Sequence, residues 1–131
     1  MKKGEMRTIV AVFTVAALLI SGAVFYSFFV SVTSDNIQKS ADAIKTAVEK
    51  DDYLLAKSCL DTLFSYLDEK EVLLGATINH NDIYNLRLAM DELSARILEK
   101  KKYDSLVCLN ILATRIRQLE QNSVLSLFNI L

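Results

Sequence analysis

The segment from Thr8 to Thr33 contains 26 residues and no charged side chain. A helix of that length rises about 39 Å, at about 1.5 Å per residue, which is enough to cross the roughly 30 Å hydrocarbon core of a bilayer. Seven residues precede it. The sequence therefore predicts a short stub over residues 1–7, a transmembrane helix over 8–33 and a single domain over 34–131.

The charges before the apolar segment predict its orientation. Lys2, Lys3 and Arg7 stand against one acid, Glu5. Because cytoplasmic flanks carry an excess of Lys and Arg, we expect a cytoplasmic stub and an extracytoplasmic domain, in a single-pass protein of the cell membrane. A stub this short leaves no room for a signalling domain of its own inside the cell.

A cleaved secretory signal is the alternative. Ser21 and Ala23 are small residues two apart, so cleavage near Ala23 would secrete the domain. The residues after such a cut, 24–30, are still strongly apolar, and secretory cores usually run only about 7–15 residues. A retained anchor fits these features better.

The composition of residues 34–131 excludes some classes of protein. They hold 12 Lys and Arg against 15 Asp and Glu, which is not the basic pattern of a nucleic-acid-binding domain. They contain no proline and only one glycine, Gly75. With so few turn formers, long helices are expected rather than strands joined by tight turns.

Apolar residues in this part recur at spacings of three and four, the period of amphipathic helices. They predict helices over roughly 35–50, 53–75, 81–100 and 103–121. The expected fold is all-α, with one N-terminal transmembrane helix followed by an antiparallel helical bundle of two tandem helical hairpins.

A shift of 49 residues aligns the two predicted hairpins. Cys59 falls on Cys108 and Glu71 on Glu120 in the same register. The apolar residues Ile44, Val48, Leu60, Leu63 and Leu67 fall on Leu93, Ile97, Leu109, Leu112 and Ile116. Any two amphipathic helices share such spacings, but the Cys and Glu coincidences favour duplication of one hairpin.

An up-and-down bundle predicts what lies at each of its ends. Both hairpin turns should lie far from the membrane, where Asp51 and Asp52 would meet the lysines at 100–102. The Gly75–Asp82 loop and the apolar tail, residues 124–131, should return toward the bilayer. We expect this tail to pack on the bundle, with insertion into the lipid interface or contact with a partner as alternatives.

The single histidine, His80, lies in the sequence Ile78-Asn79-His80-Asn81-Asp82. A metal site on His80 and Asp82 would lack the three or four ligands that zinc needs. A helix start, with Asn79 or Asn81 as cap and an acid in the first turn, is the better interpretation. His80, Asp82 and Asn129 remain the candidate interaction or junction residues.

No catalytic, metal or cofactor site is predicted. Tyr53, Tyr84 and Tyr103 lie near predicted helix starts, where they would line a small pocket or wedge between helices. No nucleophile signature and no glycine-rich phosphate loop is present, so we expect no enzyme. Cys59 and Cys108 are interpreted as small buried residues, with one disulfide as the alternative in an oxidising compartment.

Four parts of the chain together carry a family resemblance. They are the basic N-terminus with one membrane helix, the junction from Thr77 to Asp82, the amphipathic pair after it, and the ending Leu125-Ser126-Leu127-Phe128-Asn129-Ile130-Leu131. Over nearly its whole length the chain resembles a bacterial family called domain of unknown function 4363 (DUF4363). The family has no established activity, so the resemblance implies an architecture rather than a reaction.

Two hypotheses of function follow. The first is a non-enzymatic accessory or interaction subunit, whose partners are the lipid bilayer and another membrane or envelope protein. The alternative is an extracytoplasmic module that binds a small or polymeric ligand in a pocket of the bundle core. A single-pass sensor that works through a separate membrane protein is a weaker third hypothesis.

Overall fold

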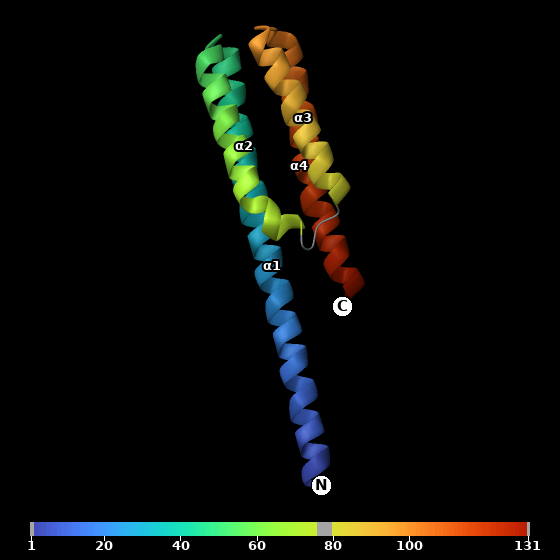
Figure 1. The fold of residues 1–131 in the computed structure, drawn as a ribbon. Coiled ribbons are helices and arrows are strands. Elements are labelled where there is room, and N and C mark those ends of the chain that lie inside the picture. Colours follow the sequence, from blue (N-terminus) through green and yellow to red (C-terminus); the bar gives the residue numbers. More distant parts are fainter. Residues whose placement is uncertain (1, 76–79, 131) are drawn as a thin grey trace.

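The computed structural model describes the backbone of residues 2–75 and 80–130 and the side chains of 2–74 and 80–123. These residues form four α-helices and no strand, as Figure 1 shows. The helices are α1 (Lys3–Glu49), α2 (Tyr53–Gly75), α3 (His80–Leu98) and α4 (Lys102–Ile130). The predicted all-α fold is confirmed.

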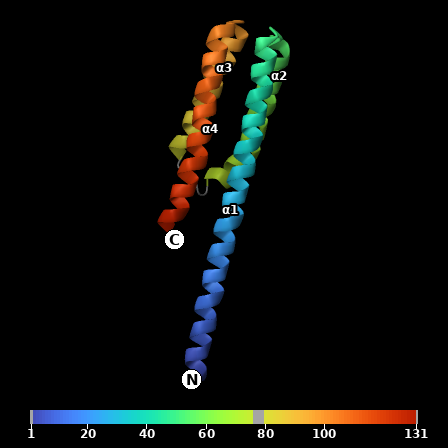
Figure 2. The same ribbon diagram turned by 180° about the vertical axis from the view of Figure 1, so that it is seen from behind.

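Helix α1 unites the predicted transmembrane helix and the first helix of the bundle. It runs for 47 residues. Between Gly22 and Glu49 the sequence contains neither glycine nor proline, so nothing interrupts the backbone hydrogen bonding. The N-terminal half of α1 therefore extends from the bundle as a single helix with no linker (Figures 1 and 2).

The four helices pack in chain order around one core. α1 packs against α2 and α4, and α3 packs against the same two helices. Both hairpin turns lie at the end of the bundle farthest from the N-terminus, as an up-and-down path requires (Figure 1). The end of α4 extends past the ends of α2 and α3, back in the direction of the N-terminus (Figures 1 and 2).

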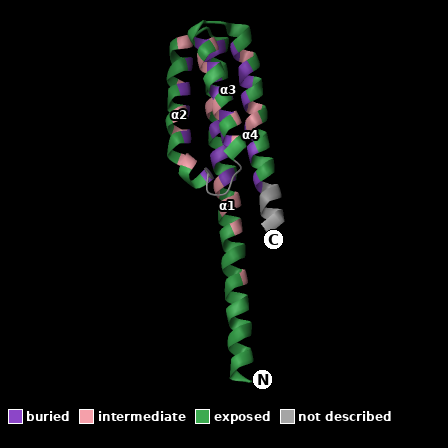
Figure 3. Ribbon diagram, turned by 45° about the vertical axis from the view of Figure 1, so that its right-hand side comes forward, coloured by how far each residue is buried: buried purple, intermediate pink, exposed green. Residues whose placement is uncertain are grey.

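The core consists of aliphatic side chains from all four helices, and burial along α1 begins at Val30 (Figure 3). Tyr26 and Phe29 are half-buried against this core. The largest fully buried side chains are Ile37, Ile44, Leu60, Leu63, Leu67, Leu74, Leu86, Met90, Leu93, Ile97, Leu112 and Leu119. The packed bundle thus starts within the last turn of the charge-free segment.

The burial pattern repeats with the shift of 49 residues. Pairs in which both members are buried are Ser34 and Ile83, Ile37 and Leu86, Ala41 and Met90, Ile44 and Leu93, Val48 and Ile97, Ala56 and Ser105, Leu60 and Leu109, Leu63 and Leu112, Leu67 and Ile116, and Leu74 and Ser123. The two hairpins therefore contribute equivalent faces to the core.

The two hairpin turns also have the same backbone hydrogen bonds. Asp52 N donates to Ala47 O at 2.9 Å, and Lys101 N donates to Arg96 O at 3.1 Å. The residue before each donor, Asp51 or Lys100, has a positive φ, 58° or 55°. This is the Schellman arrangement that ends a helix with one left-handed residue.

One predicted helix end was wrong. We expected the last helix to end near residue 121, but α4 continues to Ile130. Residues 122–130 contain no glycine or proline, and the apolar residues among them are compatible with a helix. The predicted packing of the tail on the bundle concerns side chains at 124–131, which lie outside the described residues.

Candidate functional site

The predicted junction residues lie at the end of the bundle nearer the N-terminus. His80 is the first residue of α3 and is exposed. Asp82 lies in the first turn of α3 and accepts a hydrogen bond from Asn122 Nδ2 of α4 at 3.0 Å. Asp82 therefore joins two helices of the bundle, which is a structural role.

The predicted capping of α3 is corrected in one respect. Because α3 begins at His80, Asn81 lies inside the helix and is not its cap. The other expected cap, Asn79, lies outside the described residues. The backbone of Asn129 belongs to the last turn of α4, but its side chain is also outside them.

A metal site finds no support in the described part of the chain, since no group of three or more His, Cys, Asp and Glu side chains comes together there. Cys59 and Cys108 are both free thiols. Burial raises the pKa of the Cys108 thiol above its ordinary value, so it stays protonated at neutral pH. A protonated, buried thiol is a poor nucleophile.

The far end of the bundle, opposite the N-terminus, brings the predicted acidic and basic turns together. Lys102 Nζ lies 3.4 Å from Asp51 Oδ1 and donates to the Glu49 carbonyl oxygen at 2.9 Å. This one side chain closes the space between the start of α4 and the end of α1. Asp52 caps α2, since its carboxylate accepts the backbone N–H of Leu55 at 3.1 Å.

The equivalent place between α2 and α3 is open. Under the repeat, Tyr53 replaces Lys102 and Leu98 replaces Glu49, so the same bridge cannot form. A groove remains, which we call the tip groove, lined by Asp51, Asp52, Tyr53, Leu54, Lys57, Ile97, Leu98 and Lys100. Leu54 is 84% exposed and Leu98 is 62% exposed. Two leucines beside two lysines thus face solvent.

Sequence reasoning did not single out these leucines. The available sequence signal is the apolar stripe at helical spacing, which marks the core faces. Leu54 and Leu98 lie outside this stripe. Tyr53 borders the tip groove, whereas Tyr84 and Tyr103 are exposed.

A cluster of charges joins the two hairpins where α2 and α3 meet. Arg87 of α3 donates to Asp68 at 2.5 Å and to Glu71 at 2.7 Å, both on α2. The hydrogen bond to Asp68 is the largest cause of the raised pKa of Arg87. The guanidinium is committed to these partners and serves the contact between helices.

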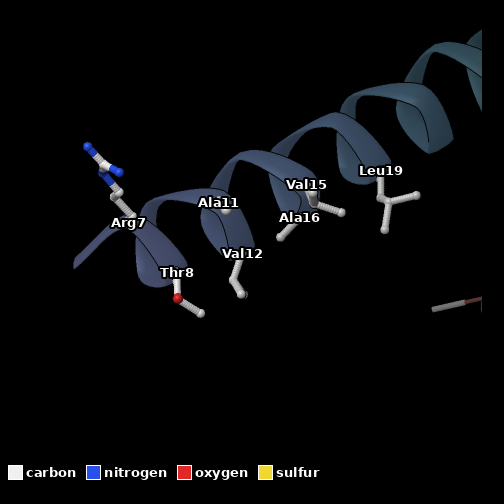
Figure 4. A pocket seen from close by; sticks show the side chains of 7 residues that line it. All are labelled: Arg7, Thr8, Ala11, Val12, Val15, Ala16 and Leu19. Atoms are coloured by element: carbon white, nitrogen blue, oxygen red, sulfur yellow. The ribbon is translucent and has the colours of Figure 1, made fainter. Parts of the chain in front are cut away.

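The N-terminal half of α1 has a different surface. An 18-residue window of this helix has a mean hydropathy of 2.4, and none of it is buried inside the protein. Figure 4 shows side chains from Arg7 to Leu19 that line a shallow surface, and all of these lining residues belong to this one helix. α1 is therefore long and apolar enough to cross a membrane, and this surface is not an enclosed ligand site.

These features define a class of protein: a four-helix bundle of two equivalent hairpins, continuous with an exposed apolar helix. A family model for a domain of unknown function, DUF4363, matches residues 24–130. The chain belongs to this family. The match begins shortly before the first buried residue, Val30, and covers the whole bundle. Searches among curated proteins and among solved structures found no match.

Proposed function

We propose that this protein is a membrane-anchored, non-enzymatic interaction subunit, whose bundle stands outside the cell and contacts another membrane or envelope protein. The supporting observation is the placement of apolar surface at opposite ends of the molecule, which the continuous helix α1 connects. The N-terminal half of α1 is suited to lipid. The tip groove, at the other end, exposes Leu54 and Leu98.

The chemistry of the tip groove indicates the kind of partner. Exposed leucines on a small domain lose unfavourable contact with water when a partner covers them. Two lysines and two aspartates line the same groove. Asp51 is paired with Lys102 and Asp52 caps α2, so Lys57 and Lys100 would attract carboxylates at the margin of the groove. The proposed partner surface therefore presents apolar side chains next to acidic ones.

A ligand held inside the bundle is the less favoured alternative. The positions that face the bundle axis are occupied by large aliphatic side chains such as Leu63, Met90 and Leu112. A ligand-binding module of this fold would need a cavity there. Tyr84 and Tyr103 are exposed, so these two tyrosines do not line the core.

Site-specific crosslinking in native membranes tests the interaction. A photoreactive residue at Leu54 should yield a discrete adduct larger than the monomer. The same residue at Thr62, exposed on the flank of α2, serves as the matched control and should yield none. The double variant L54E/L98E should lose the adduct of a second reporter placed at Tyr53. Only monomer at Leu54 would contradict the proposal.

Orientation is tested separately with a thiol reagent that does not cross membranes. In a chain with Cys59→Ala, a new thiol at Tyr103→Cys should react in intact cells, because position 103 is exposed at the tip. A new thiol at Lys3→Cys should react only after permeabilisation. The buried Cys108 should contribute little in either case. The reverse pattern would place the bundle inside the cell.

A further inference from the structure

The axial register of α1 and α4 determines how far the end of α4 reaches. At the tip, Lys102 bonds to the Glu49 carbonyl oxygen. Farther down, Ser34 and Arg117 line one groove between the same helices. Antiparallel helices advance by equal steps in opposite directions. The separation from Ser34 to Glu49 on α1 equals that from Lys102 to Arg117 on α4, so both pairs fit one register. On this register residues 124–130 lie level with about residues 27–21 of α1.

The charges of all four helices stop at nearly the same level. Within the bundle, above the charge-free segment of α1, the last charged residues toward the N-terminal end are Asp35 on α1, Glu71 on α2, Asp82 on α3 and Glu120 on α4. Glu120 lines a groove with Ser31, and Asp82 bonds to Asn122. Glu71 is equivalent to Glu120 in the repeat. On the register above, these carboxylates lie within about 10 Å along the bundle axis.

This level fits the surface of a bilayer. A span of about 20 helical residues crosses the hydrocarbon core. Counted from Phe29, just below the charges, such a span ends near Ile9, and Arg7 follows almost at once. Charged residues thus bracket the span on both sides. Phe25, Tyr26, Phe28 and Phe29 lie near its upper boundary, where aromatic residues are favoured.

The end of α4 crosses that level. Its backbone is helical to Ile130, and residues 124–130 carry no charge. We propose that this segment, which we call the α4 foot, enters the outer leaflet beside α1, so that lipid acyl chains are its partner. This inference rests on the proposed span of α1. It attaches the bundle to the membrane at a second point, so that the molecule does not turn freely about the axis of α1.

The chemistry of the α4 foot suits a shallow insertion. Val124, Leu125, Leu127, Phe128 and Ile130 supply apolar area, and Ser126 and Asn129 are its polar residues. Helices that lie in the interface bury their apolar surface to a depth of about 5–10 Å. Deeper insertion would leave the last carbonyl groups of α4 without partners in hydrocarbon. The register places the foot at about this depth.

The test uses the absence of tryptophan from the natural sequence. Each of three full-length variants carries one Trp and is reconstituted in phosphatidylcholine vesicles with or without bromines on the upper acyl carbons. Phe128→Trp reports on the foot. Phe25→Trp reports on α1, because Phe25 lies at nearly the same level as the foot and is 73% exposed. Tyr103→Trp reports on the distant tip.

We expect bromine to remove a similar fraction of the emission from Phe128→Trp and Phe25→Trp, and almost none from Tyr103→Trp. Quenching of Phe25→Trp without quenching of Phe128→Trp would overturn the foot and leave the anchor intact. Loss of quenching at both positions would overturn the anchor, and the foot with it. Equal quenching at all three positions would overturn the proposed arrangement of the bundle at the surface.

Discussion

Lys100 and Asp51 occupy left-handed backbone conformations at equivalent turns, with φ of 55° and 58°. For an L-residue with a Cβ atom this conformation costs roughly 1–2 kcal/mol, less for Asp, whose short polar side chain tolerates it. Glycine is the usual residue at this position of a Schellman motif. The hairpin turns are therefore places where the natural residues lower the stability of the fold.

Replacing Lys100 by glycine should raise the free energy of unfolding by about 1 kcal/mol, because it removes the left-handed strain. Asp51→Gly should gain less, because it also removes the ion pair with Lys102. Thermal unfolding in detergent, followed by circular dichroism, measures both. Lys50→Gly is the control, since Lys50 has an ordinary φ of −88° and glycine there should only destabilise. No gain from Lys100→Gly would contradict the reasoning.

Ser105 carries a polar side chain inside the core of the bundle. It is fully buried, and its Oγ has no hydrogen-bond partner among the described residues. The equivalent residue in the first hairpin is the buried Ala56. The same position of the repeated core is therefore filled by alanine in the first hairpin and by serine in the second.

Ser105→Ala should stabilise the protein by about 1 kcal/mol, because a buried hydroxyl without a partner loses its hydration and gains nothing in return. Urea unfolding in mild detergent measures the change. Ser58→Ala, at an exposed position of α2, changes helix propensity alone and should gain less. A loss of stability in Ser105→Ala would show that the hydroxyl is bonded in solution.

At the scale of the elements, the two hairpins have equivalent cores and different contacts between them. α1 and α4 are joined at the tip by Lys102, whereas α2 and α3 are joined lower down by Arg87. The Arg87 cluster also holds the negative charges of Asp68 and Glu71 close together. Without the guanidinium, these two carboxylates would repel each other across one turn of α2.

Arg87→Gln should lower the free energy of unfolding by about 1 kcal/mol at low ionic strength, and by less in high salt, since the partners are partly exposed. Parallel unfolding curves at two salt concentrations measure this. Arg115→Gln is the matched control, because Arg115 bonds only to Gln118 of its own helix among the contacts observed. An effect of Arg87→Gln that does not depend on salt would point to packing instead.

At the scale of the whole molecule, one continuous helix serves two environments. α1 is exposed from its start to the region of Tyr26 and is buried along one face from Val30 onward. Among the residues whose side chains the structure describes, every buried core residue therefore lies outside the N-terminal half of α1. Rigid continuity between the two halves also transmits the orientation of the anchor to the bundle.

A fragment of residues 30–131 should accordingly fold into a helical bundle with a cooperative melting transition. Circular dichroism at increasing temperature tests this in mild detergent, which also shields the apolar residues at 124–131. The matched control is the same fragment with Leu63→Ala, whose buried cavity should cost about 2–5 kcal/mol. A broad, non-cooperative transition in the unmodified fragment would mean that the apolar half of α1 stabilises the bundle.

The sequence alone predicted the all-α class, the end of α2 at Gly75 and the 49-residue repeat, because each depends on local spacing and turn formers. It also predicted that Asp51 meets a lysine at the tip, since equal helix lengths bring the turns together. It could not predict that α1 continues unbroken through Thr33 or that α4 continues to Ile130, because helix length depends on the absence of any stop as much as on pattern.

Only the tertiary structure decided what the polar and exposed residues do. Asp82 is a contact between helices because the register brings Asn122 to it, and no local pattern contains that information. The tip groove exists because Tyr53 and Leu98, between α2 and α3, occupy the positions that Lys102 and Glu49 occupy between α4 and α1. Periodicity assigns residues to faces of single helices, whereas a site depends on which faces meet and at what height, and packing sets both.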